Sequence, residues 1–263
     1  MNEDKKLLLN IIEDKYRNFQ KSYSIVTTDF LDMTQASHAA SFVRSHQREG
    51  VFFYGGYEDA TRKMVVFIPD YLAVETEEEL FLHFKDYPED CPMAVLDVKI
   101  REKGAVLKHS DYLGSILGLG IKREKTGDIM VREDGAQIFV TREIADYLAE
   151  NYYKAGRVSV EARVKEIKDL IITEANIKEI RVSVASARLD NMISAAFDVS
   201  RKAAVEAIGR GLVFVDDMEN KKPDYSLKGG EKLVLRGKGK AIYKGTSGTS
   251  KKGKIYVNFD RYI

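Results

Sequence analysis

The order of hydrophobic patterns between residues 93 and 165 constrains the fold more than any other feature of the chain. Apolar residues at alternate positions predict strands, and apolar residues three or four positions apart predict helices. The predicted order is strand, helix, strand, strand, helix, strand, over residues 94–100, 110–119, 128–132, 137–140, 142–153 and 157–164. A ferredoxin-like or RRM-like βαββαβ domain has this order. That scaffold often binds RNA but also carries unrelated functions, so it does not assign one by itself.

Two features of this segment bear on RNA binding. RNA-recognition motifs stack bases on aromatic side chains of their central strands, and the strand predicted over 137–140 contains Phe139 as its one aromatic residue. A basic loop after the first predicted helix contains Lys122, Arg123 and Lys125. These cations are candidates for contact with an RNA backbone. They equally suit the C-terminus of a helix, whose dipole favours positive charge.

The preceding segment has the pattern of a separate α+β domain. Its predicted helices and strands are helix 3–22, helix 34–47, strands 51–54 and 64–68, and helix 77–84. A proline-containing stretch over 88–92 favours a boundary near residue 90. We therefore expect a multi-domain α+β protein, with an N-terminal domain over 1–90, a βαββαβ domain over 91–170 and a C-terminal domain over 178–263 that ends in a strand extension.

Charge is distributed unevenly along the chain. The formal net charge is +1, but residues 178–263 contain 18 Lys+Arg against 10 Asp+Glu, a net charge of +8. Residues 1–177 contain 24 basic and 31 acidic side chains, a net charge of −7. A basic segment of this kind is either a solvated surface or a site for a polyanion.

Cations in the C-terminal segment coincide with predicted helix starts. The apolar spacing predicts helices over 188–197 and 201–208. Arg188 opens the first helix, Arg201 and Lys202 open the second, and Arg210 follows its end. Helix starts present free backbone amides, and arginine adds a planar fork for bidentate contact with phosphate. We therefore expect these residues to bind RNA.

The same residues resemble a known family. The matching positions are Arg188, Leu189, Asp190, Ser200, Arg201, Ala204, Ile208, Gly211, Val213, Val215, Leu227, Gly230 and Glu231. In this order they look like the αL RNA-binding domain named after ribosomal protein S-four. Such domains usually place Asn-Gly after the Val-x-Val strand, whereas this chain has Asp216 to Asn220 there. We expect a longer and more acidic turn at this point.

The chain as a whole resembles the bacterial YlmH family. The resemblance spans all three segments and includes the runs 111–114 (Asp-Tyr-Leu-Gly) and 127–129 (Gly-Asp-Ile) of the middle segment. It implies a cytoplasmic protein that binds RNA and associates with the large ribosomal subunit carrying a stalled peptidyl-tRNA. It also implies a genomic position among cell-division genes.

Enzymatic activity is not expected. Pseudouridine synthases carry their catalytic aspartate in an Arg-Leu-Asp triplet, but that triplet lies outside their αL module, whereas Asp190 lies within it, where its charge favours the helix N-terminus. A methyltransferase needs a glycine-rich loop between a strand and a helix start, and the glycines 114, 118 and 120 fall within and at the end of a predicted helix.

Cofactors, metals and membrane insertion are not expected either. The four histidines are scattered, and Cys91 is the single cysteine, so neither a cysteine-based zinc site nor an intrachain disulfide is predicted. The N-terminus has neither a signal peptide nor a membrane anchor pattern. We expect a cytoplasmic, monomeric, noncatalytic protein that binds ribosomal RNA or tRNA. The alternatives are an RNA-modifying enzyme of the pseudouridine synthase or methyltransferase type, and a protein adaptor that docks through the acidic residues 1–177.

Overall fold

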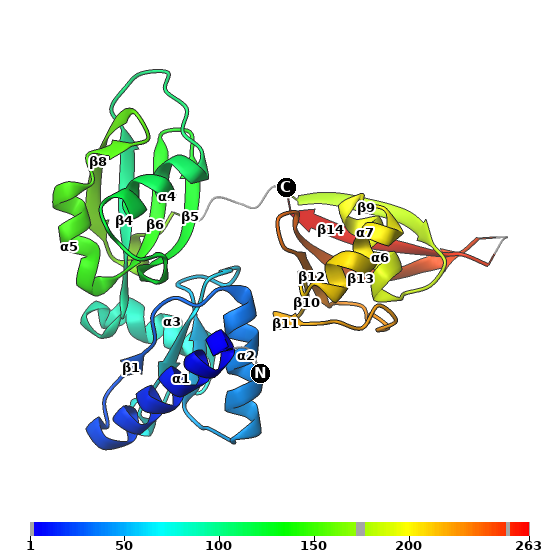
Figure 1. Cartoon of the computed structure of the whole chain (residues 1–263), viewed down its shortest axis with the longest axis horizontal. Helices are drawn as coiled ribbons and strands as arrows, with labels where there is room; N and C mark the ends of the chain where they lie inside the picture. The colour runs from blue at the N-terminus through cyan, green and yellow to red at the C-terminus, as the bar shows by residue number, and fades with distance from the viewer. Residues whose placement is uncertain (1–2, 172–176, 251–252, 263) are drawn as a thin grey trace. The chain divides into compact units, whose positions relative to one another are not determined.

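The computed structural model describes residues 3–171, 177–250 and 253–262. The chain divides into two compact units, Met1–Ile171 and Ile172–Ile263, each a mixture of helices and sheets (Figure 1). This confirms a multi-domain protein of mixed α and β structure. The finer division of the first unit near residue 90 stays a prediction. None of the helices in the described residues is both long and apolar enough to span a membrane.

The first part of the N-terminal unit is a three-stranded antiparallel sheet between helices. Its elements are α1 (Glu3–Ser22), β1 (Val26–Thr27), α2 (Met33–Ser45), β2 (Val51–Tyr54), β3 (Met64–Phe67) and α3 (Glu77–Asp86), with the strand order β1-β3-β2. Apolar residues of α1 and α2 pack on one face of this sheet, and those of α3 pack on the other. Both α2 and α3 begin at a capping box, formed by Asp32 with Gln35 and by Thr76 with Glu79.

The second part of this unit contains the predicted βαββαβ order. Its elements are β4 (Met93–Ile100), α4 (His109–Gly118), β5 (Thr126–Arg132), β6 (Gly135–Thr141), α5 (Arg142–Asn151), the short β7 (Lys154–Ala155) and β8 (Val158–Lys165). The strands are antiparallel in the order β5-β6-β4-β8-β7. Helices α4 and α5 bury their apolar residues against one face of this sheet.

The opposite face of the same sheet packs against the first part of the unit. Phe139 is completely buried there, and its ring stacks on Tyr57 with centroids 5.4 Å apart. Gly56 has a φ of +90°, and a Cβ at this position would lie 2.4 Å from a ring carbon of Phe139. The backbone therefore approaches Phe139 as closely as glycine permits. Phe139, the one aromatic residue predicted on this strand, is therefore not accessible to a base.

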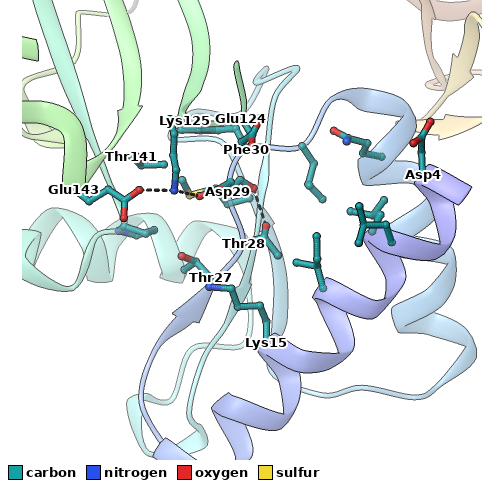
Figure 2. A pocket seen from close by; sticks show the side chains of 17 residues that line it. Asp4, Lys15, Thr27, Thr28, Asp29, Phe30, Glu124, Lys125, Thr141 and Glu143 are labelled. Atoms are coloured by element: carbon teal, nitrogen blue, oxygen red, sulfur yellow. Dashed lines mark hydrogen bonds and ion pairs between the residues drawn. The ribbon is translucent and has the colours of Figure 1, made fainter. Parts of the chain in front are cut away.

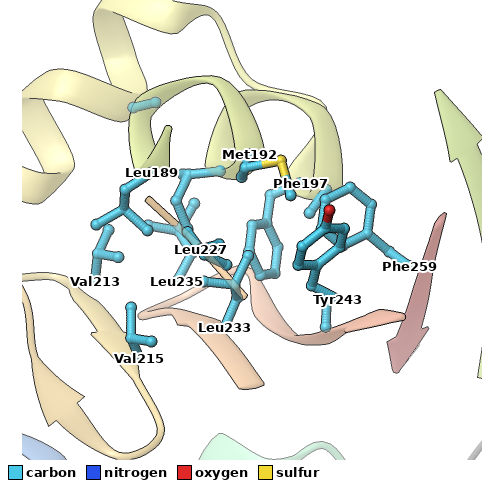
Figure 3. Packing of buried hydrophobic residues seen from close by; sticks show 14 of the residues in the cluster. Leu189, Met192, Phe197, Val213, Val215, Leu227, Leu233, Leu235, Tyr243 and Phe259 are labelled. Carbon is cyan, nitrogen blue, oxygen red and sulfur yellow. The ribbon is translucent and has the colours of Figure 1, made fainter. Parts of the chain in front are cut away.

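The described residues of the C-terminal unit form a six-stranded antiparallel sheet and two helices. The elements are β9 (Ile177–Val184), α6 (Leu189–Phe197), α7 (Arg201–Gly209), β10 (Val213–Val215), β11 (Met218–Glu219), β12 (Lys232–Leu235), β13 (Gly239–Thr249) and β14 (Ile255–Tyr262). The strand order is β11-β10-β12-β13-β14-β9. Figure 3 shows apolar side chains of α6 packed against those of the sheet, among them Leu189, Phe197 and Phe259.

The turn after β10 corrects the sequence expectation of a longer loop. Val215 pairs directly with Met218, so Asp216 and Asp217 form a two-residue turn, and both have positive φ values. Aspartate tolerates this conformation better than most residues. Lys232 stabilises the turn, because its amide donates to Asp216 and its ammonium group contacts the Asp217 carboxylate at 2.9 Å.

Candidate nucleic-acid interface

A buried carboxylate joins the starts of α6 and α7. The Asp190 residue is 1% exposed and lies in the first turn of α6. Arg201, the first residue of α7, donates to its Oδ2 through Nη2 at 2.8 Å and Nε at 3.1 Å. Arg188, the N-cap residue of α6, donates to it over longer distances of 3.3 and 3.4 Å. The structure therefore brings Arg188 and Arg201 together around one carboxylate.

The two arginines keep Asp190 ionised. Burial by itself opposes the charged form of a carboxyl group. The hydrogen bonds from Arg201, Arg188 and the Asn191 amide outweigh this effect and hold the pKa of Asp190 below its ordinary value. The side chains of Arg188 and Arg201 are still 44% and 61% exposed, so each guanidinium also faces solvent. One buried negative charge thus orients two accessible positive charges.

The backbone amides at the start of α6 are already used within the protein. The Leu189 amide donates to the Tyr225 carbonyl at 2.8 Å, and the Asp190 amide donates to the Pro223 carbonyl at 3.0 Å. The expectation that this helix start offers free amides to phosphate is therefore wrong for these two groups. The loop around Tyr225 satisfies them instead, which leaves the Arg188 guanidinium as the accessible donor at the start of α6.

The other predicted cations of this unit lie in different positions. Lys202 is exposed and follows Arg201 in the first turn of α7, so it adds a charge beside the arginine pair. Arg210 lies at the other end of α7, about 14 Å along the helix axis from Arg201 at 1.5 Å per residue. Arg210 contacts Glu206 at 3.9 Å one helical turn earlier. Arg210 therefore does not belong to the same cluster.

The predicted basic loop of the N-terminal unit is largely engaged in internal contacts. Arg123 donates to the carbonyls of Thr126 and Gly127, and burial lowers the pKa of its guanidinium. Lys125 contacts both the Asp29 carboxylate, at 2.8 Å, and the Glu143 carboxylate. Lys122 is exposed. Of these three predicted RNA contacts, Arg123 and Lys125 thus have a structural role that the sequence did not indicate.

Lys125 lies at the edge of a groove of about 590 Å³, shown in Figure 2. Apolar residues of α1, among them Leu8 and Ile11, line the groove together with residues 27–31. Figure 2 shows the Lys125 ammonium group between the carboxylates of Asp29 and Glu143. Besides Lys125, the groove is lined by Lys15 and by four acidic residues, Asp4, Asp29, Glu124 and Glu143, so it is a poor receptor for phosphate.

Neither a metal centre nor a reactive carboxylate is evident at the interface. Within the residues that the structure describes, no group of three or more His, Cys, Asp and Glu side chains is arranged to hold a metal ion. The Asp190 carboxylate is buried and bound by two arginines, so it is not presented to a substrate. The sequence predicts Asp190 at a helix start but does not predict that it bridges two arginines. The Arg-x-Asp spacing of Arg188 and Asp190 is the one local indication of that role.

Comparison with known proteins places this architecture in a family. Residues 87–169 match the family model described as "Putative RNA-binding domain in YlmH". The chain is 30% identical over 245 residues to the "Ribosome-associated protein quality control protein P2" of Bacillus subtilis, a match that covers 93% of this chain and 90% of that protein. The chain belongs to the YlmH family. A solved YlmH structure, "Cell division protein ylmH from Streptococcus pneumoniae", aligns with 65% of this chain and 97% of that chain, at 20% identity and a TM-score of 0.46.

The YlmH family model assigns RNA binding to a part of the chain that has no excess of positive charge. Residues 87–169 contain 14 Lys+Arg and 15 Asp+Glu, a net charge of −1, against +8 for residues 178–263. Positive charge, which favours contact with a polyanion, is therefore concentrated in residues 178–263. The two parts of the chain thus differ in net charge.

Proposed function

We propose that this chain is a noncatalytic, cytoplasmic, monomeric protein that binds structured ribosomal RNA or tRNA on the large ribosomal subunit carrying a stalled peptidyl-tRNA. The observation that carries the proposal is the pair of arginines, Arg188 and Arg201, fixed at two helix starts by the buried Asp190. Support also comes from the family model for residues 87–169, whose description names RNA binding. The name of the Bacillus subtilis relative supports association with the ribosome.

The arginine pair suits phosphate better than two independent surface cations would. A guanidinium group carries five donors in a rigid plane, and the carboxylate of Asp190 occupies part of that plane on each arginine. The remaining donors face solvent in a fixed orientation, so less conformational freedom is lost when an anion binds. Two arginines and one aspartate leave a net charge of +1, to which Lys202 adds another. We infer that this cluster grips the RNA backbone and that it does not read base sequence.

The middle part of the chain is proposed to bind RNA by shape. Its net charge of −1 gives it little attraction to phosphate, and Phe139 on its sheet is buried. The exposed Lys122 is the contact that we retain from its basic loop. Double-stranded RNA is recognised mainly through the shape of its minor groove and its 2′-hydroxyl groups. This mode of binding needs few cations.

The test is RNA binding by the full chain across a salt series, with ribosomal subunits and isolated ribosomal RNA as ligands. Charge reversal of Arg201 is a poor variant, because a glutamate there would face the buried Asp190 carboxylate. Arg201→Gln together with Lys202→Gln removes two charges without this conflict. Each lost phosphate contact should reduce the slope of log affinity against log salt by about 1. Lys21→Gln, at an exposed position in α1 of the N-terminal unit, is the matched control.

An unchanged affinity and slope in the Arg201→Gln, Lys202→Gln double variant would refute the proposed interface. Arg201→Lys separates geometry from charge, because lysine keeps the charge and loses the planar fork. We expect a weaker affinity with a preserved slope for this variant. Association with ribosomal subunits that survives ribonuclease treatment would instead indicate a protein partner. Mass shifts in ribosomal RNA from a strain that lacks the protein would indicate an RNA-modifying enzyme.

A further inference from the structure

The sheet of the C-terminal unit carries an exposed aromatic side chain on the face opposite its helices. Along β14, Val257 and Phe259 are buried in the core with α6 and α7. Side chains alternate between the two faces of a strand, so Tyr256 and Asn258 lie on the other face. Tyr256 is 36% exposed. This face of the sheet is therefore not simply a polar, solvated surface.

Glycines flank Tyr256 and Asn258 on the neighbouring strand β13. Gly248 pairs with Tyr256 and Gly245 pairs with Asn258, and each follows a shift in the strand register. Both glycines have positive φ values, and a Cβ at either position would meet no atom within 4 Å. Glycine within a strand often marks a bulge or a place where a ligand approaches closely. The space beside the tyrosine ring and the asparagine amide is open on this side.

Strand β9 supplies a cation on the other side of β14. Arg181 pairs with Asn258 and Ser183 pairs with Tyr256. The Arg181 guanidinium lies 5.3 Å from the centroid of the Tyr256 ring, within the range of a cation–π contact. The Arg181 guanidinium thus lies over the Tyr256 ring, and both kinds of surface stack on nucleobases.

The end of the β13–β14 hairpin is rich in groups that contact phosphate. Residues 244–254 consist of four lysines, three glycines, two threonines and two serines. Figure 1 shows the hairpin extending beyond α6 and α7, and the described residues beyond Tyr243 are mostly exposed. Lys244 contacts Asp260 at 3.2 Å, whereas Lys254 is exposed near the end of the hairpin. Lysine, hydroxyl groups and backbone amides are all frequent partners of phosphate oxygens.

We propose that this face of the hairpin, defined by Tyr256, Arg181, Asn258 and Lys254, binds an unpaired nucleotide of the RNA. The base stacks on the Tyr256 ring, which the cation–π contact with Arg181 holds in place. The Asn258 amide lies within reach of the polar edge of the base, and Lys254 contacts the adjoining phosphate. This proposal rests on the proposed function and adds a second contact to the arginine pair. Lysines protect the edges of sheets from aggregation, but β13 and β14 lie inside this sheet, and edge protection would not explain an exposed aromatic ring paired with a glycine. A base needs both the ring and the open space.

The experiment measures binding of the full chain to two RNA probes by fluorescence anisotropy. One probe is a single-stranded oligoadenylate of about 12 nucleotides, which is the size range that single-strand sites cover, and the other is a duplex of the same length. Tyr256→Ala should weaken binding of the single strand by about 5- to 150-fold, which corresponds to the free energy that stacking of one base on an aromatic ring contributes. Duplex affinity and the salt slope should not change, because stacking carries no charge. Tyr256→Phe should restore the affinity, and Tyr71→Ala, an exposed tyrosine in the N-terminal unit, is the control.

Arg181→Gln provides a second variant that does not alter the ring, and it should weaken single-strand binding and preserve duplex binding. Wild-type affinity of Tyr256→Ala for the oligoadenylate would overturn the proposal, as would equal losses for both probes or no rescue by phenylalanine. Failure of the wild-type chain to bind the oligoadenylate while it binds ribosomal RNA would also overturn it and leave the arginine pair standing. The Arg201→Gln, Lys202→Gln double variant should weaken binding of both probes, so the two proposals fail separately.

Discussion

Replacing Asp190 with asparagine tests the arrangement on which the proposed function depends. The carboxylate accepts two hydrogen bonds from Arg201, at 2.8 and 3.1 Å, and one from the Asn191 amide at 2.9 Å. An asparagine side chain can keep one oxygen for the backbone amide. Its NH₂ group would then face the Arg201 guanidinium, so a donor would meet a donor. The substitution removes the anchor while changing the size of the side chain very little.

The expected loss of stability follows from these contacts. A hydrogen bond to a charged group contributes roughly 1.5–3 kcal/mol, and two such bonds from Arg201 are lost. Arg201 is 61% exposed and regains water when released, so much of the cost is recovered. The longer bonds from Arg188 contribute less, because hydrogen bonds weaken beyond about 3.2 Å. We expect Asp190→Asn to destabilise the C-terminal unit by about 2–3 kcal/mol, at or just below the low end of the roughly 3–5 kcal/mol that breaking a buried ion pair costs.

The assay is amide hydrogen exchange of the full chain, followed in peptides from α6 and α7. A loss of about 2–3 kcal/mol corresponds to about 30- to 150-fold faster exchange of amides that open with this unit. Peptides from the N-terminal unit serve as an internal reference. Asp198→Asn is the matched control, because Asp198 is exposed and ends α6 with a φ of 52°, a conformation that asparagine also tolerates. Unchanged exchange in Asp190→Asn would refute the structural role of the carboxylate.

The difference between wild type and Asp190→Asn should depend on pH. The folded-state pKa of Asp190 is lowered, so its contribution to stability is present above the unfolded-state pKa of about 3.9 and is lost as the pH falls through the lower folded-state pKa. The difference in exchange should therefore be constant between about pH 5 and pH 8, and it should shrink below about pH 4. A difference that grew on acidification would contradict this sign.

RNA binding by Asp190→Asn distinguishes positioning from net charge. The substitution removes a negative charge beside Arg188 and Arg201, so an interface governed by charge alone would bind RNA more tightly. If the carboxylate orients the two guanidinium groups, affinity should fall despite the added positive charge. Tighter binding at low salt would therefore refute the proposed role of Asp190 in RNA recognition.

Three further predictions concern the N-terminal unit. Lys125→Gln breaks the contacts with Asp29 and Glu143 and should lower the free energy of unfolding in urea by about 1 kcal/mol, with no change in RNA affinity; a clear loss of affinity would restore Lys125 as an RNA contact. Phe139→Ala should cost about 3–5 kcal/mol in the same titration, because the ring is completely buried, and a smaller effect would contradict its core position. Burial raises the pKa of the Cys91 thiol to about 12, so at pH 8 a thiol reagent should modify the unfolded chain and spare the native one.

Local patterns predicted most helices and strands of the described residues. Helix 3–22 occurs with the predicted bounds, and the βαββαβ order occurs with the short β7 inserted before β8. These elements have clear apolar periodicity, which reflects one buried face. The hairpin of β13 and β14 was expected merely as a strand extension, because residues 244–254 contain no apolar residue to show alternation. Pairing with β9 stabilises β14, and this pairing joins residues about 75 positions apart in the sequence.

The candidate site was predictable in part, because local patterns indicate helix starts but not the contacts between distant segments. Arg188 and Arg201 could be placed at helix starts from caps and spacing, but their meeting at Asp190 depends on how α6 and α7 pack. The ion pair of Lys125 is made with Asp29, which lies 96 positions away in the sequence. Spacing along the sequence locates cations, whereas the fold decides which of them are already neutralised.

The division of charge between the two units suggests how one chain can bind RNA with two different kinds of surface. A domain with a net charge of −1 binds a polyanion weakly when alone, since neutralisation of phosphates supplies most nonspecific affinity. Attachment to residues 178–263, which have a net charge of +8, raises its effective concentration near the same RNA. The middle part can then select a shape without having to supply the affinity. Substitutions that remove the positive charge of Arg188 or Arg201 should therefore reduce binding of every RNA. Substitutions in residues 87–169 should instead alter which RNA is preferred.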